Sequence, residues 1–138
     1  MKHFNLSEFF RSSTAAKNDI KNEPSPAERA TIVRNINLLV DNVLDPVRDK
    51  FSTPVIITSG YRCPRVNMLV GGSKNSQHMS GCAADFHVGG FTPLMMYQVF
   101  LYIFDTLAFD QLIYYHSKNI IHVSYVDNCN RHEAFIKK

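Results

Sequence analysis

The order of apolar and polar residues along the chain predicts one long helix. Ser25-Pro26-Ala27-Glu28 forms a capping box with proline at the first helical position, and apolar residues then recur at helical spacing to about Lys50. The recurring apolar residues are Ile32, Ile36, Leu39, Val40, Val43 and Val47. We therefore predict a core helix over residues 26–50, which Pro46 kinks or ends within its last turns.

The residues before this helix predict a peripheral lead-in. Residues 5–21 carry a short helical signal with Ser7 as a suitable N-cap, and the polar stretch over residues 18–26 predicts a loop. We expect residues 1–24 to pack across the rest of the chain as an N-terminal clasp.

Short runs of β-branched and aromatic residues predict the strands. Residues 54–60 and 83–88 fit buried strands, and a short helical turn, a Gly-Gly break and a polar loop separate them. Residues 109–116 and 120–126 fit two strands joined by a tight hairpin, and the closing HEAFIKK segment adds an edge strand.

A second helix and the overall order of elements complete the predicted fold. Thr92-Pro93 begins a helix that runs to about Thr106 and is so rich in Leu, Met and aromatic residues that we expect it to be buried on most sides. The order of elements predicts an α+β fold with helices packed on one face of a largely antiparallel sheet. With 138 residues, 45% of them hydrophobic, residues 1–138 have the size of a single domain.

Composition excludes several classes of partner. The net charge of +3 is small, and Lys and Arg are scattered singly, so the chain lacks the basic stripe of a nucleic-acid binder. No apolar run reaches the roughly 18 residues of a membrane span, and the N-terminus lacks the features of a signal peptide. We expect a monomer that is cytoplasmic when made, with no nucleic-acid or membrane partner.

Cysteine usage argues against a disulfide scaffold or a thiolate zinc cage. The three cysteines, Cys63, Cys82 and Cys129, are an odd number and form no CxxC pair. Cys82 fits either a small buried residue or a thiol close to a metal site.

Three residues form a candidate metal site, namely His78, Asp85 and His122. Two imidazoles and one carboxylate are the ligand set of a catalytic zinc site that keeps a fourth position for water, whose pKa the metal lowers toward about 7. Gly81 allows a sharp turn between the first two residues, and His122 projects from a predicted strand. Hydrogen-bonded histidines and a turn-capping aspartate would also fit this spacing.

The surrounding residues resemble a known family. Residues 76–85 read SxHxxGxAxD and are followed by HVS at 122–124, which looks like the signature of the zinc D-Ala-D-Ala carboxypeptidases, of peptidase M15 type. That family includes vancomycin-resistance dipeptidases, phage endolysins and the zinc fold of Hedgehog signalling domains. Ser59-Gly60-Tyr61-Arg62, Asn67, Gly71-Gly72 and Phe109–Ile113 further resemble its small, phage-associated branch, so the resemblance covers nearly the whole chain.

The resemblance implies a cofactor and a set of roles. His78, Asp85 and His122 would bind Zn2+, and Arg62 would correspond to the substrate-binding arginine of the family. An arginine just past a strand end can also offer two parallel donors to a carboxylate or an oxyanion. Ser76 would donate a hydrogen bond to the substrate or orient His78, although a loop serine can also simply form a turn.

One part of the family pattern is absent. The family usually has an acidic residue a few positions before the last histidine to handle the proton of the attacking water, whereas this chain has His116 six positions before His122 and Asn119 three before. Because histidine titrates near neutral pH, His116 is the predicted catalytic base. Asp110 lies too far along its strand, while His87 shares a strand face with Asp85 and could orient a ligand.

The resemblance therefore implies a zinc-dependent peptidase that hydrolyses D-Ala-containing peptidoglycan stem peptides, as a DD-carboxypeptidase or an endopeptidase of the endolysin type. Such an enzyme, of phage or prophage origin, would act on the cell wall after release. The alternatives are a catalytically silent zinc-bearing module that binds the cell wall, and a phage structural component. Structural zinc usually has four closed, cysteine-rich ligands, which argues against the last alternative.

Overall fold

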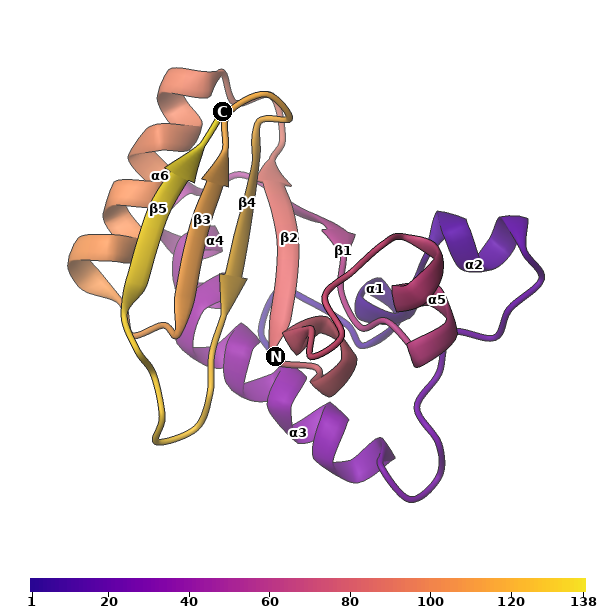
Figure 1. The fold of residues 1–138 in the computed structure, drawn as a ribbon. Helices are drawn as coiled ribbons and strands as arrows, with labels where there is room; N and C mark the ends of the chain where they lie inside the picture. The colour runs from indigo at the N-terminus through magenta and orange to yellow at the C-terminus, as the bar shows by residue number, and fades with distance from the viewer.

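The computed structural model describes residues 1–138 and centres on a five-stranded sheet in the order β1-β2-β4-β3-β5 (Figure 1). Every neighbouring pair is antiparallel except β3 and β5, which are parallel. The strands are β1 Val55–Ser59, β2 Ala83–Val88, β3 Gln111–Tyr115, β4 Ile120–Ser124 and β5 Glu133–Lys137. The predicted α+β fold with a largely antiparallel sheet is confirmed.

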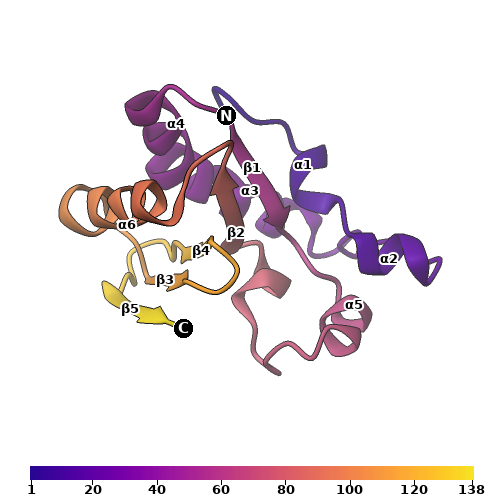
Figure 2. The same ribbon diagram turned by 90° about the horizontal axis from the view of Figure 1, so that it is seen from above.

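The main helices cover one face of this sheet, and the other face stays open over most of its width (Figures 1 and 2). The covering elements are α3 Arg29–Leu39, the π-helical segment η1 Val40–Leu44, α4 Asp45–Phe51 and α6 Pro93–Thr106. Two short elements, α5 Pro64–Leu69 and the 3-10 turn η2 Gln77–Ser80, lie on the other side near β1 and β2. The apolar core therefore lies between the helices and the sheet, which leaves the opposite sheet face available for polar side chains.

The proline inside the long helix explains its π-helical segment. Pro46 lies in the first turn of α4, directly after η1. Proline has no N–H to donate and its ring clashes with the carbonyl of the residue four positions earlier, so the helix widens locally instead of breaking. The prediction that Pro46 perturbs the last turns is confirmed, and the helix continues to Phe51.

The helix starts differ from the sequence predictions. Residues 5–21 form two short helices, α1 Ser7–Phe10 and α2 Ser13–Lys17, because Arg11 is extended. The prediction of Ser7 as an N-cap was wrong, since Ser7 is the first residue of α1 and Leu6 holds the N-cap position. Ser12 caps α2 by accepting from the Ala15 amide at 3.1 Å. Residues 26–28 form a turn ahead of α3, where the Ser25 hydroxyl contacts the Glu28 carboxylate at 2.9 Å.

Helix α6 is less buried than its composition predicts. Met96, Val99, Phe100 and Ile103 are buried against the sheet, but an opposite stripe is exposed to solvent. The exposed residues are Leu94, Met95, Tyr97, Leu101 and Phe104. The expectation of burial on most sides was wrong because the helix has a packing partner on one face alone. No helix combines the length and apolarity that crossing a bilayer requires.

The N-terminal residues are tied to the end of β1. The buried Asn22 side chain donates to the carbonyls of Phe10 at 3.0 Å and Tyr61 at 2.8 Å, and it accepts from the Cys63 amide at 2.8 Å. A Cβ on Gly60 would lie 2.6 Å from the Phe9 carbonyl oxygen, so only glycine permits this close approach. The segment that follows β1 is thereby fixed before it reaches the open face.

Candidate metal centre

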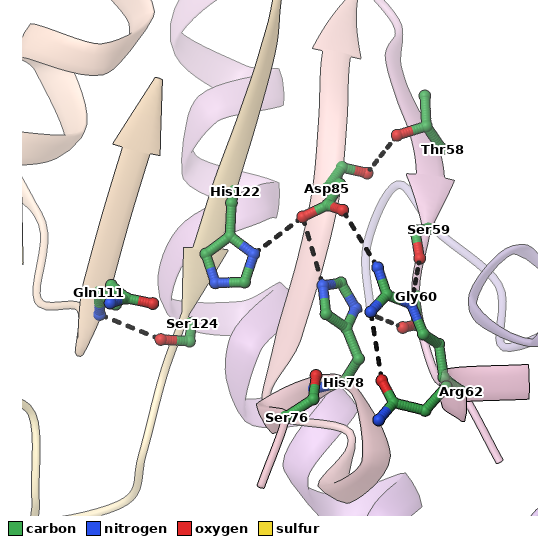
Figure 3. A network of polar contacts seen from close by, with 11 residues as sticks. Thr58, Ser59, Gly60, Arg62, Ser76, His78, Asp85, Gln111, His122 and Ser124 are labelled. Atoms are coloured by element: carbon green, nitrogen blue, oxygen red, sulfur yellow. Dashed lines mark hydrogen bonds and ion pairs between the residues drawn. The ribbon is translucent and has the colours of Figure 1, made fainter. Parts of the chain in front are cut away.

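His78, Asp85 and His122 come together on the open face of the sheet (Figure 3). Asp85 on β2 and His122 on β4 are cross-strand partners, and His78 approaches from the turn η2. One potential ligand atom from each residue lies within 4.8 Å of the others. The structure thus brings together the three residues that the sequence singled out as metal ligands.

The Asp85 carboxylate is the centre of this cluster. Its Oδ1 atom lies 2.8 Å from Nδ1 of His122 and 3.3 Å from Nε2 of His78. Burial by itself would raise the pKa of Asp85, but the hydrogen bonds from His122 and His78 outweigh burial and hold this pKa well below its ordinary value. The carboxylate is therefore ionised and can act as an anionic ligand at any physiological pH.

The Gly60 carbonyl fixes the tautomer of His78. Nδ1 of His78 lies 2.7 Å from the Gly60 oxygen, and because a carbonyl oxygen only accepts, Nδ1 must carry the proton. Nε2, which contacts Asp85 at 3.3 Å, is then the ring nitrogen that can release its proton and bind a metal ion. A backbone carbonyl that holds the far nitrogen of a histidine is the usual support of a metal-ligating imidazole.

The turn that carries His78 is held by local backbone geometry. The Ser76 hydroxyl accepts from the His78 amide at 3.2 Å, and the Arg62 amide donates to the His78 carbonyl at 3.1 Å. Gly81 ends the turn at φ +77°, where a Cβ would lie 2.7 Å from the Ile32 carbonyl oxygen. This contact of Ser76 is the local turn that a loop serine can form, and it holds the backbone that carries His78.

Arg62 lies beside the cluster with its guanidinium half-buried. One terminal nitrogen is 3.7 Å from Oδ2 of Asp85, while further donors reach Ser59 Oγ at 3.3 Å and Asn67 Oδ1 at 3.4 Å. These contacts hold the Arg62 guanidinium beside Asp85, at the edge of the cluster, as Figure 3 shows. A positive group there can meet the negative charge of a substrate carboxylate or of a tetrahedral intermediate.

A cleft of about 410 Å³ opens onto the three residues. Besides the cluster and Arg62, it is lined by Val70, Gly71, Gly72, Ser73, Ser76, Tyr115, Lys118 and Ile120. Asp85 contributes the single carboxylate of this lining, and Arg62 and Lys118 contribute two permanent positive charges. The cleft is therefore suited to a ligand that carries negative charge.

The predicted base His116 is not among the residues that line the cleft. It lies just past β3 with an exposed side chain, and its ring packs edge-on against Tyr114, which is buried against α6 and contacts the Pro93 carbonyl. Side chains alternate along a strand, so residue 116 follows Tyr114 to the helix-covered face. His116 therefore does not face the cleft, which argues against its predicted role as the catalytic base.

Tyr115 is the β3 residue that faces the cleft at this level. Its strand partner Ile120 shares a face with His122, so Tyr115 projects toward the cluster. Burial, followed by the nearby Asp85 carboxylate, raises the pKa of Tyr115, although Arg62 lowers it in part. A phenol in this setting is neutral at working pH and serves as a hydrogen-bond donor. The sequence by itself did not indicate this residue, because the register between β3 and β4 is needed to place it on the same face as His122.

The buried carboxylate of Asp110, paired with the exposed Arg131 side chain, supports the His78 turn from the other side. The Asp110 carboxylate accepts from Gln77 Nε2 at 2.8 Å and binds the Arg131 guanidinium through two contacts of 3.0 and 2.8 Å. The hydrogen bonds from Arg131, with Gln77 contributing, lower the pKa of Asp110 to about 2 despite its burial. This supporting role of Asp110 was not predicted, because nothing in the sequence indicates that Gln77 and Arg131 converge on it.

Three further residues considered for the site have other surroundings. His87 shares a face with Asp85, but it pairs with Ile56 further along β2 and does not line the cleft. Asn119 forms part of the hairpin turn and accepts from the Tyr114 hydroxyl at 2.8 Å. Cys82 is buried, and this burial raises the pKa of its thiol, so it fits the reading of a small buried residue.

The donor set fits a zinc ion. Two imidazoles and one carboxylate match the protein ligands of catalytic zinc, and the cleft leaves room for a further ligand. Figure 3 shows the imidazoles and the carboxylate converging, with Gly60 beside His78. The sequence also matches a family model described as Peptidase M15, over residues 2–124, which includes the whole cluster. A comparison with curated proteins gave no match.

Proposed function

The chain belongs to the peptidase M15 family, and on this basis we propose that it is a zinc-dependent peptidase that hydrolyses D-alanine-containing peptides of peptidoglycan. The observation that carries the proposal is the His78, Asp85 and His122 cluster at the base of a cleft whose rim is positively charged. Family membership supports a metallopeptidase, and the ligand set supports zinc as the metal.

We assign His78, Asp85 and His122 to metal binding. A zinc ion held there would supply a Lewis acid that polarises the scissile carbonyl and lowers the pKa of a water molecule. The Gly60 carbonyl keeps the proton on Nδ1 of His78, so that Nε2 can bind. The low pKa of Asp85 keeps the third ligand anionic.

The cationic side chains of the cleft are assigned to substrate binding. Arg62 can donate two hydrogen bonds to the terminal carboxylate of a short peptide, and Lys118 at the rim adds a second positive charge. The donor pattern favours a substrate that ends in a free carboxylate, hence carboxypeptidase over endopeptidase action. Ser76 holds the His78 turn and lines the same cleft.

We assign Tyr115, and not His116, as the residue of β3 that contacts the amide to be hydrolysed. Its hydroxyl can donate to the carbonyl oxygen as negative charge develops there, which lowers the barrier to attack. The raised pKa keeps the hydroxyl protonated, so Tyr115 acts as a donor and not as a base. The cleft then has no carboxylate besides Asp85 that could act as a general base toward a water molecule, and we therefore expect a low turnover number.

The absence of a second carboxylate from the cleft lining also favours a second candidate function. In that case the chain is a zinc-bearing module that binds peptidoglycan peptides without cleaving them. Both candidates use the same metal and the same cationic rim, so metal content by itself does not separate them. For the active enzyme, we extend the proposal to cell-wall degradation after release, as in the phage-associated proteins that the sequence resembles.

One experiment separates the two candidates. Purified protein is assayed for zinc by mass spectrometry and then for release of D-alanine, or of new amino groups, from peptidoglycan with and without chelator. One zinc per chain with chelator-sensitive release supports the peptidase. Zinc without release, together with retention of the protein on peptidoglycan, supports the binding module, and absence of zinc after growth in zinc-supplemented medium contradicts both.

A further inference from the structure

The strand β5 leaves one edge of the sheet open beside an apolar groove. It is the last strand in the order and pairs with β3 alone. A groove of about 300 Å³ between β5 and α6 is lined by apolar residues alone. Phe135 and Ile136 on the strand are 37% and 48% exposed, and Phe104 on the helix is 41% exposed. An open edge next to exposed apolar residues is a surface on which another strand can pair.

The backbone of β5 shows which residues offer hydrogen bonds at this edge. The Glu133 amide donates to the Asp110 carbonyl, and the Lys137 carbonyl accepts from the His116 amide, so both residues direct their backbone groups toward β3. Backbone groups alternate in direction along a strand. Ala134 and Ile136 therefore direct their N–H and C=O groups outward, where an antiparallel partner could exchange hydrogen bonds with them.

The charges on β5 are complementary to those of a second copy in one register. If two β5 strands pair antiparallel about Phe135, then Ala134 lies opposite Ile136 of the other copy and forms the hydrogen-bonded pairs. Glu133 lies opposite Lys137 of the other copy, twice over by symmetry. Centring the pair on Ala134 or on Ile136 instead would place Phe135 opposite a charged residue. Only the register centred on Phe135 satisfies the outward backbone groups and the charges together.

We propose that two copies of this chain associate through their β5 strands, antiparallel and centred on Phe135, to form a continuous sheet across a two-fold axis. This departs from the monomer expected from the sequence. A two-fold interface uses the same patch on both copies, which fits a strand whose charges complement themselves. The paired strands would also bring the two apolar grooves together at the interface and reduce their exposure to water.

The pairing has a geometric consequence for the metal centres. His122 lies opposite Ile113, and Ile113 lies opposite Phe135, so these residues follow one line across the sheet to the symmetry axis. Residues in that line share a face, and five strand spacings would separate the two copies of His122 by about 24 Å. Both clefts would open on the same side of the dimer. If the proposed function holds, one polymeric substrate could occupy both clefts.

Sedimentation equilibrium of the full chain across a concentration series tests this interface without any assay of activity. The wild type should show a monomer–dimer equilibrium. Glu133→Lys alone and Lys137→Glu alone place like charges opposite each other and should each raise the dimer dissociation constant at least about ten-fold. The double variant, with both substitutions, restores opposite charges and should return the constant to near the wild-type value.

A matched control is Lys17→Glu, which makes the same charge change as Lys137→Glu at an exposed position on α2 and should leave the equilibrium unchanged. A wild-type chain that remains monomeric at the highest concentration would overturn the proposal. A dimer that is insensitive to the single reversals, or that the double variant fails to restore, would also overturn it. Zinc content and D-alanine release are measured separately, so failure here leaves the proposed function standing.

Discussion

The two halves of the metal centre are positioned by different means. Asp85 and His122 lie opposite each other on neighbouring strands, so the hydrogen-bonded ladder between β2 and β4 fixes their separation. His78 instead lies on a short 3-10 turn that depends on the Gly60 carbonyl, the Ser76 hydroxyl and other individual contacts. The difference teaches that the strand half depends on the sheet as a whole, whereas the turn half can be weakened by a single side-chain change.

Loss of a ligand from either half should have the largest effect. His78→Ala and His122→Ala each leave two ligands, too few to hold zinc in a catalytic site. Loss of a hydrogen bond that supports a ligand lowers metal affinity by up to about 100-fold. Because these variants lose a ligand itself, we expect zinc affinity to fall by more than that. Titration with a competing chelator measures this. His87→Ala, on the same strand face as Asp85 but outside the cleft, is the control and should keep its zinc. Full zinc occupancy in His78→Ala would refute the ligand assignment.

The next largest effect separates the two neighbours Tyr115 and His116. Tyr115→Phe removes the hydroxyl that faces the cleft and should lower kcat by about 100-fold, the scale of one lost donor to a developing oxyanion, with zinc content unchanged. His116→Ala removes a side chain on the other face and should leave kcat close to wild type. Steady-state kinetics on a D-Ala-D-Ala peptide compares the two. If His116→Ala lowered kcat more than Tyr115→Phe, the assignment of Tyr115 as the hydrogen-bond donor would be wrong.

A smaller loss of activity is expected from Arg62→Lys, at the edge of the cluster beside Asp85. Lysine keeps the positive charge but loses the planar fork that binds a carboxylate through two hydrogen bonds. We expect kcat/KM to fall about 10- to 30-fold, mainly through KM. This corresponds to the lower end of the range of about 1.5 to 3 kcal/mol that a hydrogen bond between charged groups contributes. Arg65→Lys, at an exposed position on α5, is the matched control. Equal kinetics for both variants would mean that Arg62 serves the fold and not the substrate.

The turn half can be weakened without touching a ligand. Gln77→Ala removes the hydrogen bond between the His78 turn and Asp110, and we expect zinc affinity to fall by about 10-fold, the lower end of the range for supporting contacts. Gln98→Ala, on an exposed position of α6, should leave the affinity unchanged. The same chelator titration distinguishes them. If Gln77→Ala binds zinc like wild type, the turn is held by its backbone contacts alone.

The smallest effect concerns stability at low pH. The pKa of Asp110 is lowered to about 2, so its ion pair contributes its full stability above the ordinary aspartate pKa and loses it as pH falls from about 4 through 2. Asp110→Asn should cost about 1 kcal/mol in the free energy of unfolding at pH 6, and the difference from wild type should shrink toward pH 2. Urea unfolding at several pH values measures this. A difference that stays constant across the series would exclude the carboxylate as its source.

Much of the fold follows from local patterns in the sequence. The strand Ala83–Val88 and the helix Pro93–Thr106 have the predicted bounds, because alternation and an N-cap–proline pair are signals contained within a few residues. The exposed stripe of α6 was missed because composition reports how apolar a helix is and not how many partners it has. The break at Arg11 was missed because a single extended residue divides two weak helical signals.

The sequence by itself determined the kinds of residue at the centre: two histidines, an aspartate and an arginine in a recognisable order, with the three candidate ligands placed on a turn and two strands. Only the tertiary structure decided which neighbours face them. Tyr115 and His116 are adjacent in sequence, yet strand pairing directs one to the cleft and the other to the helix-covered face. Likewise, Asp110 supports the His78 turn through Gln77 and is itself held by Arg131, and the fold brings these three residues together from distant positions. Local spacing in the sequence specifies which functional groups are present. Strand register and long-range packing specify where each side chain points, because a one-residue shift along a strand reverses the face that a side chain occupies.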